Sequence, residues 1–168
     1  MSNCFICGRG ASWCDGHLNE ITEPRVTRSI YVIGSMRNPR VPEVAKALRA
    51  VGIDAFDDWH SPGPDTDEKW QEYEKARKRP YREALAGYHA QNVYAFDKYH
   101  LDRCDAALLV LPAGKSGHLE LGYMIGRGKP GYILLDGEPE RLDVMYNFAT
   151  AVLTSLEQLI VEQGVGRL

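Results

Sequence analysis

The residues with the clearest chemical potential lie in one short segment, from Gly114 to Tyr123. It reads GKSGHLELGY, follows an apolar run and leads into a helical pattern. Backbone N–H groups at a helix start favour a bound anion, and Gly114 and Gly117 let the backbone approach a ligand closely. Glu120 adds a carboxylate in the first turn of this helix. The segment therefore combines an anion-binding loop with a group that can act as a nucleophile or stabilise positive charge.

This segment has two other interpretations. Lys115 and Ser116 look like the end of a P-loop, but that motif requires a glycine at position 109, which is Leu109. We therefore reject a nucleoside-triphosphatase site of that form. Glu120 also has an ordinary interpretation, because the helix dipole stabilises a carboxylate near a helix start without any catalytic role. Spacing alone leaves the catalytic and the ordinary interpretation of Glu120 open.

Two further loops follow β-rich runs and carry polar or aromatic side chains. The loop after the first run contains Gly34, Ser35 and Arg37, and a guanidinium matches the oxygens of a phosphate in a fork. The loop after the second run contains Asp58 and Trp59, whose indole can stack on a nucleobase. Each set also fits a simple exposed loop or turn.

The elements around these loops alternate between strand and helix. Such alternation predicts a parallel sheet covered on both faces, with ligands bound outside the carboxyl ends of the strands. The three polar loops therefore share one edge of the sheet. A long polar region, 69–99, is divided by Pro80 into two helical pieces. The expected strands are 28–33, 53–56, 106–111 and 132–135, and the other expected helices are 41–51, 118–126 and about 156–162.

Length and composition fit one globular domain with a small appendage. The chain has 168 residues, of which 44% are hydrophobic and 26% are charged. No apolar run approaches the roughly 20 residues of a membrane helix, and no secretory signal begins the sequence, so we expect a cytoplasmic protein. A formal net charge of -3 argues against a broad surface for nucleic acid.

Three of the four cysteines lie close together near the start of the chain. Their pairing as Cys-x2-Cys and Cys-x2-His has the ligand set and spacing of a closed, structural zinc site. An unmetallated tail is the alternative. We expect a zinc-knuckle-like appendage over 1–25 and an enzyme-like domain over 26–168. The fourth cysteine, Cys104, stands alone, and we expect it to be a packed thiol. The proposed ligands are Cys4, Cys7, Cys14 and His17.

Three stretches, in this order, resemble the nucleoside 2-deoxyribosyltransferase family: IYVIGSMRNP, FDKYHLDRCDAALLVLP and SGHLELGYMIGRGKP. The family includes a branch that hydrolyses deoxynucleoside 5′-monophosphates. The resemblance spans roughly 29–152, and its most specific part is the segment from Ser116 to Gly122. Asp97 and the pair Cys104-Asp105 match the sequence pattern that this family shows just before its central strand.

This resemblance implies a flavodoxin-like α/β fold, Glu120 as nucleophile and Asp97 as its acidic partner, with no cofactor needed for catalysis. It also implies a homodimer in which the segment 145–150 of a neighbour reaches the site. Lys115 and Ser116 stand where transferases carry an acidic residue, which favours a substrate with a 5′-phosphate. The candidate substrate-binding residues are Gly34, Ser35, Arg37, Asp58, Trp59, Lys115, Ser116, Gly117 and Asn147.

The sequence thus predicts cleavage or exchange of the N-glycosidic bond of a (deoxy)nucleoside 5′-monophosphate. One alternative is a 2-deoxyribosyltransferase acting on free nucleosides. Another is a non-catalytic sensor of a nucleotide or ADP-ribose-type ligand on the same fold. The base, the sugar, the choice between hydrolysis and transfer, and the role of the region 69–99 stay open.

Overall fold

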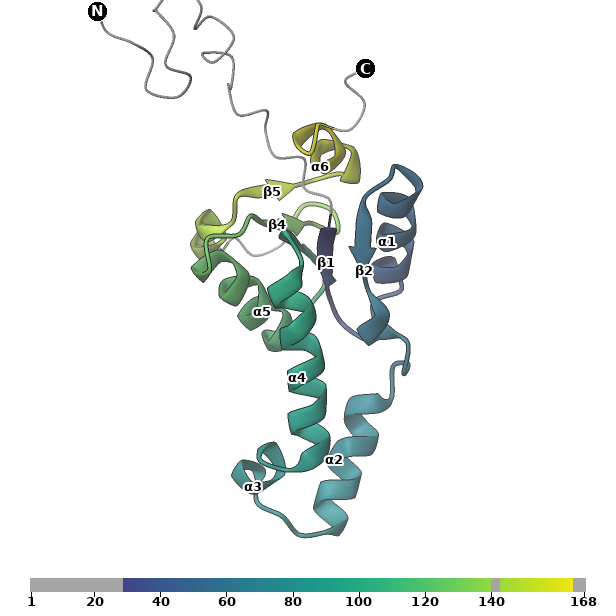
Figure 1. The fold of residues 1–168 in the computed structure, drawn as a ribbon, viewed down its shortest axis with the longest axis vertical. Coiled ribbons are helices and arrows are strands. Elements are labelled where there is room, and N and C mark those ends of the chain that lie inside the picture. Colours follow the sequence, from purple (N-terminus) through teal and green to yellow (C-terminus); the bar gives the residue numbers. More distant parts are fainter. Residues whose placement is uncertain (1–28, 140–142, 165–168) are drawn as a thin grey trace, which may run out of the picture.

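Figure 1 shows the computed structural model of the chain, which describes residues 29–139 and 143–164. Its centre is a five-stranded parallel sheet with the strand order β2-β1-β3-β4-β5. This is the order of flavodoxin-like doubly wound folds, and the expected α/β class is confirmed. The strands are β1 (Ser29–Ile33), β2 (Asp54–Phe56), β3 (Ala106–Val110), β4 (Gly131–Leu134) and β5 (Ala151–Leu153).

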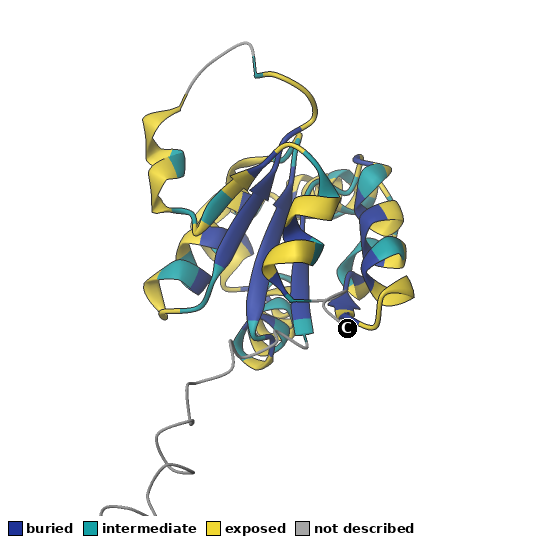
Figure 2. Cartoon of the chain, turned by 90° about the horizontal axis from the view of Figure 1, so that it is seen from above, coloured by how far each residue is buried: buried dark blue, intermediate teal, exposed yellow. Residues whose placement is uncertain are grey.

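The strands are buried on both faces because helices cover each side of the sheet (Figure 2). Ile30 and Val32 point to the face covered by α1 (Arg40–Ala50) and α6 (Leu156–Glu162). Tyr31 and Ile33 point to the opposite face, which is covered by α4 (Tyr88–Arg103) and α5 (Lys115–Gly126). Alternating side chains of β1 therefore contribute to two separate apolar layers.

The strand order reverses direction between β1 and β3, and the loops after these strands open at the same edge. In doubly wound sheets such a reversal leaves a crevice in which ligands bind. The loops after β1 and β3 carry Ser35 and Gly114 into this crevice. The three polar loops recognised in the sequence therefore do meet at one edge of the sheet.

Between β2 and β3 the chain leaves the sheet and forms an arm. Figure 1 shows α2 (Thr66–Ala76) and the first half of α4 projecting beyond the sheet, joined by α3 (Tyr81–Leu85). Pro80 separates α2 from α3, as predicted. The second predicted piece is not one helix, because Gly87 adopts an extended backbone and caps α4. A side chain at Gly87 would lie 2.7 Å from the Arg79 guanidinium, so glycine suits this break.

Three details differ from the sequence-based expectation. The helix expected from position 118 begins at Lys115, so Ser116 and Gly117 belong to its first turn rather than to a loop. The edge strand β5 was not predicted, because three residues are too short to show a pattern. Two short 3-10 helices, η2 (Asp58–His60) and η3 (Val144–Phe148), were also not expected.

Some expectations fall on parts of the chain that lie outside the described residues. These are the appendage over 1–25 and all four proposed zinc ligands, Cys4, Cys7, Cys14 and His17. Within the described ranges, Cys104 is fully buried, as expected for a packed thiol. No helix in those ranges is long and apolar enough to cross a membrane.

Candidate active site

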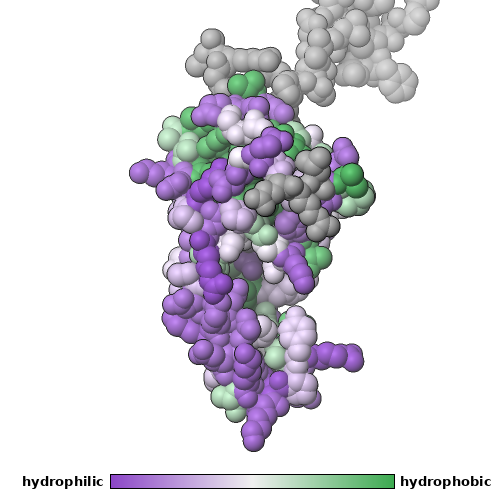
Figure 3. Space-filling view, turned by 180° about the vertical axis from the view of Figure 1, so that it is seen from behind, coloured by the Kyte–Doolittle hydropathy of each residue, from purple (hydrophilic) through white to green (hydrophobic). Residues whose placement is uncertain are grey.

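A cavity of about 720 Å³ opens at the carboxyl ends of β1 and β3 and continues between α2 and α4. The sheet side of its wall comes from the loop after β1, from η2 and from the first turns of α5. The arm supplies the other side through Trp70, His89 and Val93. Figure 3 shows that the face of the arm seen from behind is mostly hydrophilic.

Glu120 and Asp97 both line this cavity, although 22 residues of other structure, including β3, separate them in the chain. Burial, followed by the negative charge of Asp97, raises the pKa of the Glu120 carboxyl from its ordinary 4.5 to about 8. Burial also raises the pKa of Asp97, against a hydrogen bond from Tyr31 that lowers it. Near neutral pH the Glu120 carboxyl therefore keeps its proton, beside a second carboxyl that interacts with it.

Tyr31 is a buried neighbour of Asp97. Its side chain on β1 is 1% exposed, and its hydroxyl donates to Asp97 Oδ1 at 3.2 Å. Burial and the nearby carboxylates of Glu120 and Asp97 raise the pKa of Tyr31, so it stays a neutral donor. Tyr31 therefore orients Asp97 and supports its ionised form.

Gly117 sets the position of α5 and hence of Glu120. A Cβ at Gly117 would lie 2.9 Å from Ile33 Cγ2 and 3.1 Å from Leu109 Cδ1. Glycine thus lets the first turn of α5 pack directly against the ends of β1 and β3. Glu120 follows three residues later, on the same side of the helix. The close packing of Gly117 therefore brings the carboxylate into the cavity.

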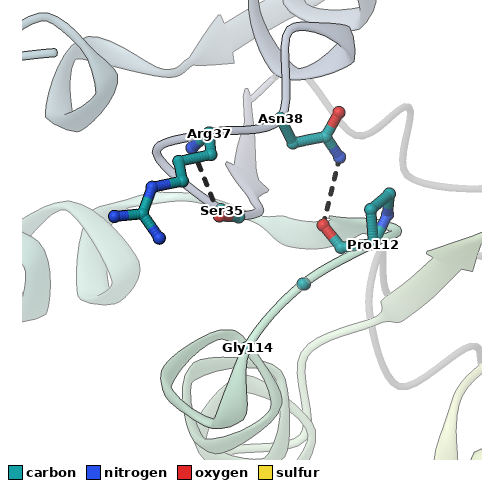
Figure 4. Close-up of a pocket in the computed structure, with 6 residues that line it drawn as sticks. Ser35, Arg37, Asn38, Pro112 and Gly114 are labelled. Carbon is teal, nitrogen blue, oxygen red and sulfur yellow. Dashed lines mark hydrogen bonds between the residues drawn. The ribbon is translucent and has the colours of Figure 1, made fainter. Parts of the chain in front are cut away.

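A smaller cavity of about 180 Å³ lies next to the first, and Ser35 and Gly114 line both. Figure 4 shows its wall, built from the loop after β1 and the loop after β3. Asn38 joins the two loops, since its Nδ2 donates to the carbonyl oxygens of Val110 and Pro112, each at 3.2 Å. Arg37 lines this cavity together with Gly114, the N-cap residue of α5. A guanidinium and a helix N-terminus that border one cavity can both attract an anion.

The residues proposed from the sequence fall into three groups. One group lines the larger cavity, and Arg37 lines the smaller one, where it also forms an ion pair with Glu68 of α2. Lys115 and Asn147 are exposed and line neither cavity. The residues that line the larger cavity are Gly34, Ser35, Asp58, Trp59, Asp97, Ser116, Gly117 and Glu120.

Trp59 and Asn147 illustrate how local contacts decide these placements. The Trp59 indole donates to the carbonyl oxygen of Val32 at 2.8 Å, which fixes the ring at the cavity wall. Asn147 lies in η3, where its Nδ2 donates to the carbonyl oxygen of Val144 at 2.9 Å. This 3-10 helix contacts α5 through Tyr146, whose hydroxyl lies 3.2 Å from His118 Nε2.

Sequence reasoning missed Tyr31, Asn38 and Glu68. A buried strand tyrosine needs a partner for its hydroxyl, which is a signal that could have found Tyr31. Asn38 and Glu68 act through contacts with residues far along the chain, and the sequence carries no signal for these contacts. No group of three or more His, Cys, Asp or Glu side chains within 29–139 and 143–164 is arranged to hold a metal ion.

Comparison with protein-family models and with curated proteins gives no match. Among solved structures, the chain is similar to a 2-deoxyribosyltransferase from Bacillus psychrosaccharolyticus (17% identity, TM-score 0.52), over 78% of this chain and 89% of that one. It is also similar to a conserved protein from Enterococcus faecalis V583 (13% identity, TM-score 0.56), over 82% and 98%. A CMP N-glycosidase from Clostridium botulinum, BcmB, gives 11% identity and a TM-score of 0.47, over 81% and 98%. The first two similarities show a shared fold.

Proposed function

We propose that this protein cleaves or exchanges the N-glycosidic bond of a (deoxy)nucleoside 5′-monophosphate, with Glu120 as the nucleophile. The observation that carries the proposal is the coupled pair of Glu120 and Asp97 inside a large cavity that adjoins a smaller, anion-suited one. The fold shared with a 2-deoxyribosyltransferase supports the same chemistry. Two carboxyl groups with one shared proton supply both an attacking carboxylate and an acid.

In the proposed first step, a carboxylate oxygen of Glu120 attacks C1′ of the sugar. The C1′–N bond breaks and its electron pair goes to the base nitrogen. The proton that Glu120 holds in the free protein passes to Asp97 as Glu120 attacks, and from Asp97 to the leaving base. Positive charge on the sugar in the transition state is stabilised by the carboxylate beneath it. The products are a glycosyl ester on Glu120 and a neutral base.

In the second step, water or a second base attacks C1′ of this ester. Asp97, now ionised, accepts the proton of the attacking group, and Glu120 leaves as a carboxylate. Tyr31 donates to Asp97 in both steps and limits the movement of its side chain. Glu120 and Asp97 together then hold one proton again, as before the reaction. Attack by water gives hydrolysis, whereas attack by an acceptor base gives transfer of the sugar.

The phosphate of the substrate would occupy the smaller cavity. Arg37 supplies a positive charge, Ser35 supplies a hydroxyl, and the start of α5 at Gly114 supplies backbone N–H groups. Because Ser35 and Gly114 also line the larger cavity, a phosphate bound there would adjoin the cavity that contains Glu120. Binding energy from the phosphate can then hold C1′ over the carboxylate.

A homodimer is part of the same proposal. The side chains of Val144, Met145 and Phe148 on η3 are 70%, 59% and 71% exposed, which is unusual for large apolar residues. Asn147 lies among them and does not line the cavity of its own chain. A second copy would cover this apolar segment and bring Asn147 to the partner's cavity. Light scattering should give a dimer, whereas a monomer at working concentration would remove this part of the proposal.

The decisive assay incubates the protein with nucleosides and nucleoside 5′-monophosphates, with and without an acceptor base, and measures released base by chromatography. We expect release from a 5′-monophosphate, and Glu120→Gln should lower its rate by several orders of magnitude. Glu43→Gln, an exposed glutamate on α1, is the matched control. Equal turnover of nucleoside and monophosphate would favour the transferase alternative, and tight binding without turnover would favour a sensor.

A further inference from the structure

Glu68, at the start of α2, makes an ion pair with Arg37 that spans from the arm to the loop after β1. The Glu68 and Arg37 side chains are 44% and 65% exposed, so a ligand can reach the pair, although Oε2 of Glu68 is itself buried. Figure 4 shows the Arg37 side chain extending from its loop away from Asn38 and Pro112. The guanidinium proposed to bind a phosphate is therefore already paired with a carboxylate of the protein.

Within the part of the chain that the structure describes, the walls of the two cavities offer no second permanent positive charge to replace Arg37. Among the described residues that line either cavity, Arg37 is the only lysine or arginine. Lys115 is exposed and lines neither cavity. A phosphate in the smaller cavity must therefore share Arg37 with Glu68 or displace it.

We propose that Glu68 is a specificity-determining residue, which pairs with Arg37 in the free protein and is displaced by the phosphate of the correct substrate. The inference rests on the phosphate site of the proposed function. A phosphate dianion carries more charge than a carboxylate and forms stronger hydrogen bonds with a guanidinium, so it wins this competition. A ligand that offers a hydroxyl in place of the phosphate cannot displace a carboxylate, so it leaves the pair intact.

The same pair links the phosphate site to the wall of the larger cavity. Asp67 and Trp70 flank Glu68 on α2 and line that cavity. While Glu68 is bound to Arg37, the start of α2 is tied to the loop after β1. Displacement of Glu68 by a phosphate would remove this tie between α2 and the loop after β1.

A positioning role for Glu68 predicts the opposite result. If Glu68 only held the guanidinium in place for the phosphate, its removal would weaken phosphate binding. If Glu68 competes with the phosphate, its removal strengthens binding. The sign of the change therefore distinguishes the two roles.

The experiment measures the affinity of the full chain for inorganic phosphate and for a nucleoside 5′-monophosphate by calorimetry, at one pH and about 0.15 M salt. We expect Glu68→Gln to bind both about two- to fivefold more tightly, the range set by an exposed ion pair. Arg37→Ala should lose most of the binding. Glu72→Gln removes the same charge one helical turn further along α2, from an exposed side chain, and should leave both affinities unchanged.

Each other outcome overturns a defined part of the account. Binding that depends on Arg37 but is unchanged or weaker in Glu68→Gln would overturn the competition and leave the phosphate site standing. Equal tightening in Glu72→Gln would assign the effect to overall charge and would also overturn it. Absence of Arg37-dependent binding in every variant would remove the phosphate site itself, and with it this inference.

Discussion

Replacing Glu120 with glutamine should stabilise the folded protein at high pH. In the folded chain the pKa of Glu120 is raised to about 8, whereas the unfolded chain keeps the ordinary value of 4.5. A group whose pKa is raised on folding prefers its protonated form in the native state. The native state therefore loses stability as pH rises through this window, because its carboxyl ionises later than that of the unfolded chain.

The size of the effect follows from these two values. At 1.36 kcal/mol per pKa unit, a rise from 4.5 to about 8 corresponds to roughly 5 kcal/mol once both states are ionised. Glu120 is only partly buried, so solvent screening reduces the expected gain of Glu120→Gln to about 2–4 kcal/mol. This is a large share of the 5–15 kcal/mol that stabilises a typical domain.

Chemical denaturation of the parent and of Glu120→Gln between pH 4 and pH 9 measures this difference. The gain in free energy of unfolding from Glu120→Gln should be small below pH 4.5, grow as pH rises, and level off above about pH 8. Asp97→Asn removes the second cause of the raised pKa of Glu120. In the Asp97→Asn background, the gain from Glu120→Gln should therefore level off at a lower pH. A difference between parent and Glu120→Gln that does not change with pH would show that Glu120 ionises normally and refute the reasoning.

Three further predictions concern the other parts of the site. Tyr31→Phe removes the hydrogen bond that lowers the pKa of Asp97, so the pKa of Asp97 should rise. The pH–rate profile should then shift to higher pH, and kcat should fall roughly tenfold. An unchanged pH–rate profile would show that Tyr31 serves packing alone. Arg37→Ala should reduce kcat/KM for a 5′-monophosphate by an amount equal to about 2–3 kcal/mol of transition-state stabilisation. The slow reaction of the free nucleoside should be unchanged. An equal loss of kcat/KM for both substrates would argue against a phosphate contact. Protein purified without added zinc should contain one equivalent by metal analysis, and a content far below one would count against the proposed ligands, which are Cys4, Cys7, Cys14 and His17.

The sequence predicted the sheet well where the pattern was strong. Four strands appear as buried apolar runs bounded by glycine, proline or polar turns, and their alternation with helices gave the parallel sheet and its ligand-binding edge. The strand β5 was not predicted, because it has only three residues and lies at the edge of the sheet. The break before α4 lies at Gly87, whose backbone is extended, a local conformation that a helical pattern does not reveal.

The site was predictable in its parts rather than in its contacts. Loop position and residue type pointed to Glu120, Arg37 and Ser35, and the family resemblance pointed to Asp97. The hydrogen bond from Tyr31 to Asp97 joins residues 66 apart, and the pair of Arg37 and Glu68 joins residues 31 apart. Local spacing carries no information on such pairs, because they depend on where the fold places α4 and the arm helix α2 relative to β1 and the loop that follows it.

The most direct test of the central claim is a search for the glycosyl ester on Glu120. The protein is mixed with a nucleoside 5′-monophosphate, quenched with acid within one turnover and analysed by intact and peptide mass spectrometry. The account predicts an added mass of one sugar phosphate on the peptide that contains Glu120, and none in Glu120→Gln. Release of free base by Glu120→Gln at the parent rate, with no adduct in either protein, would contradict it.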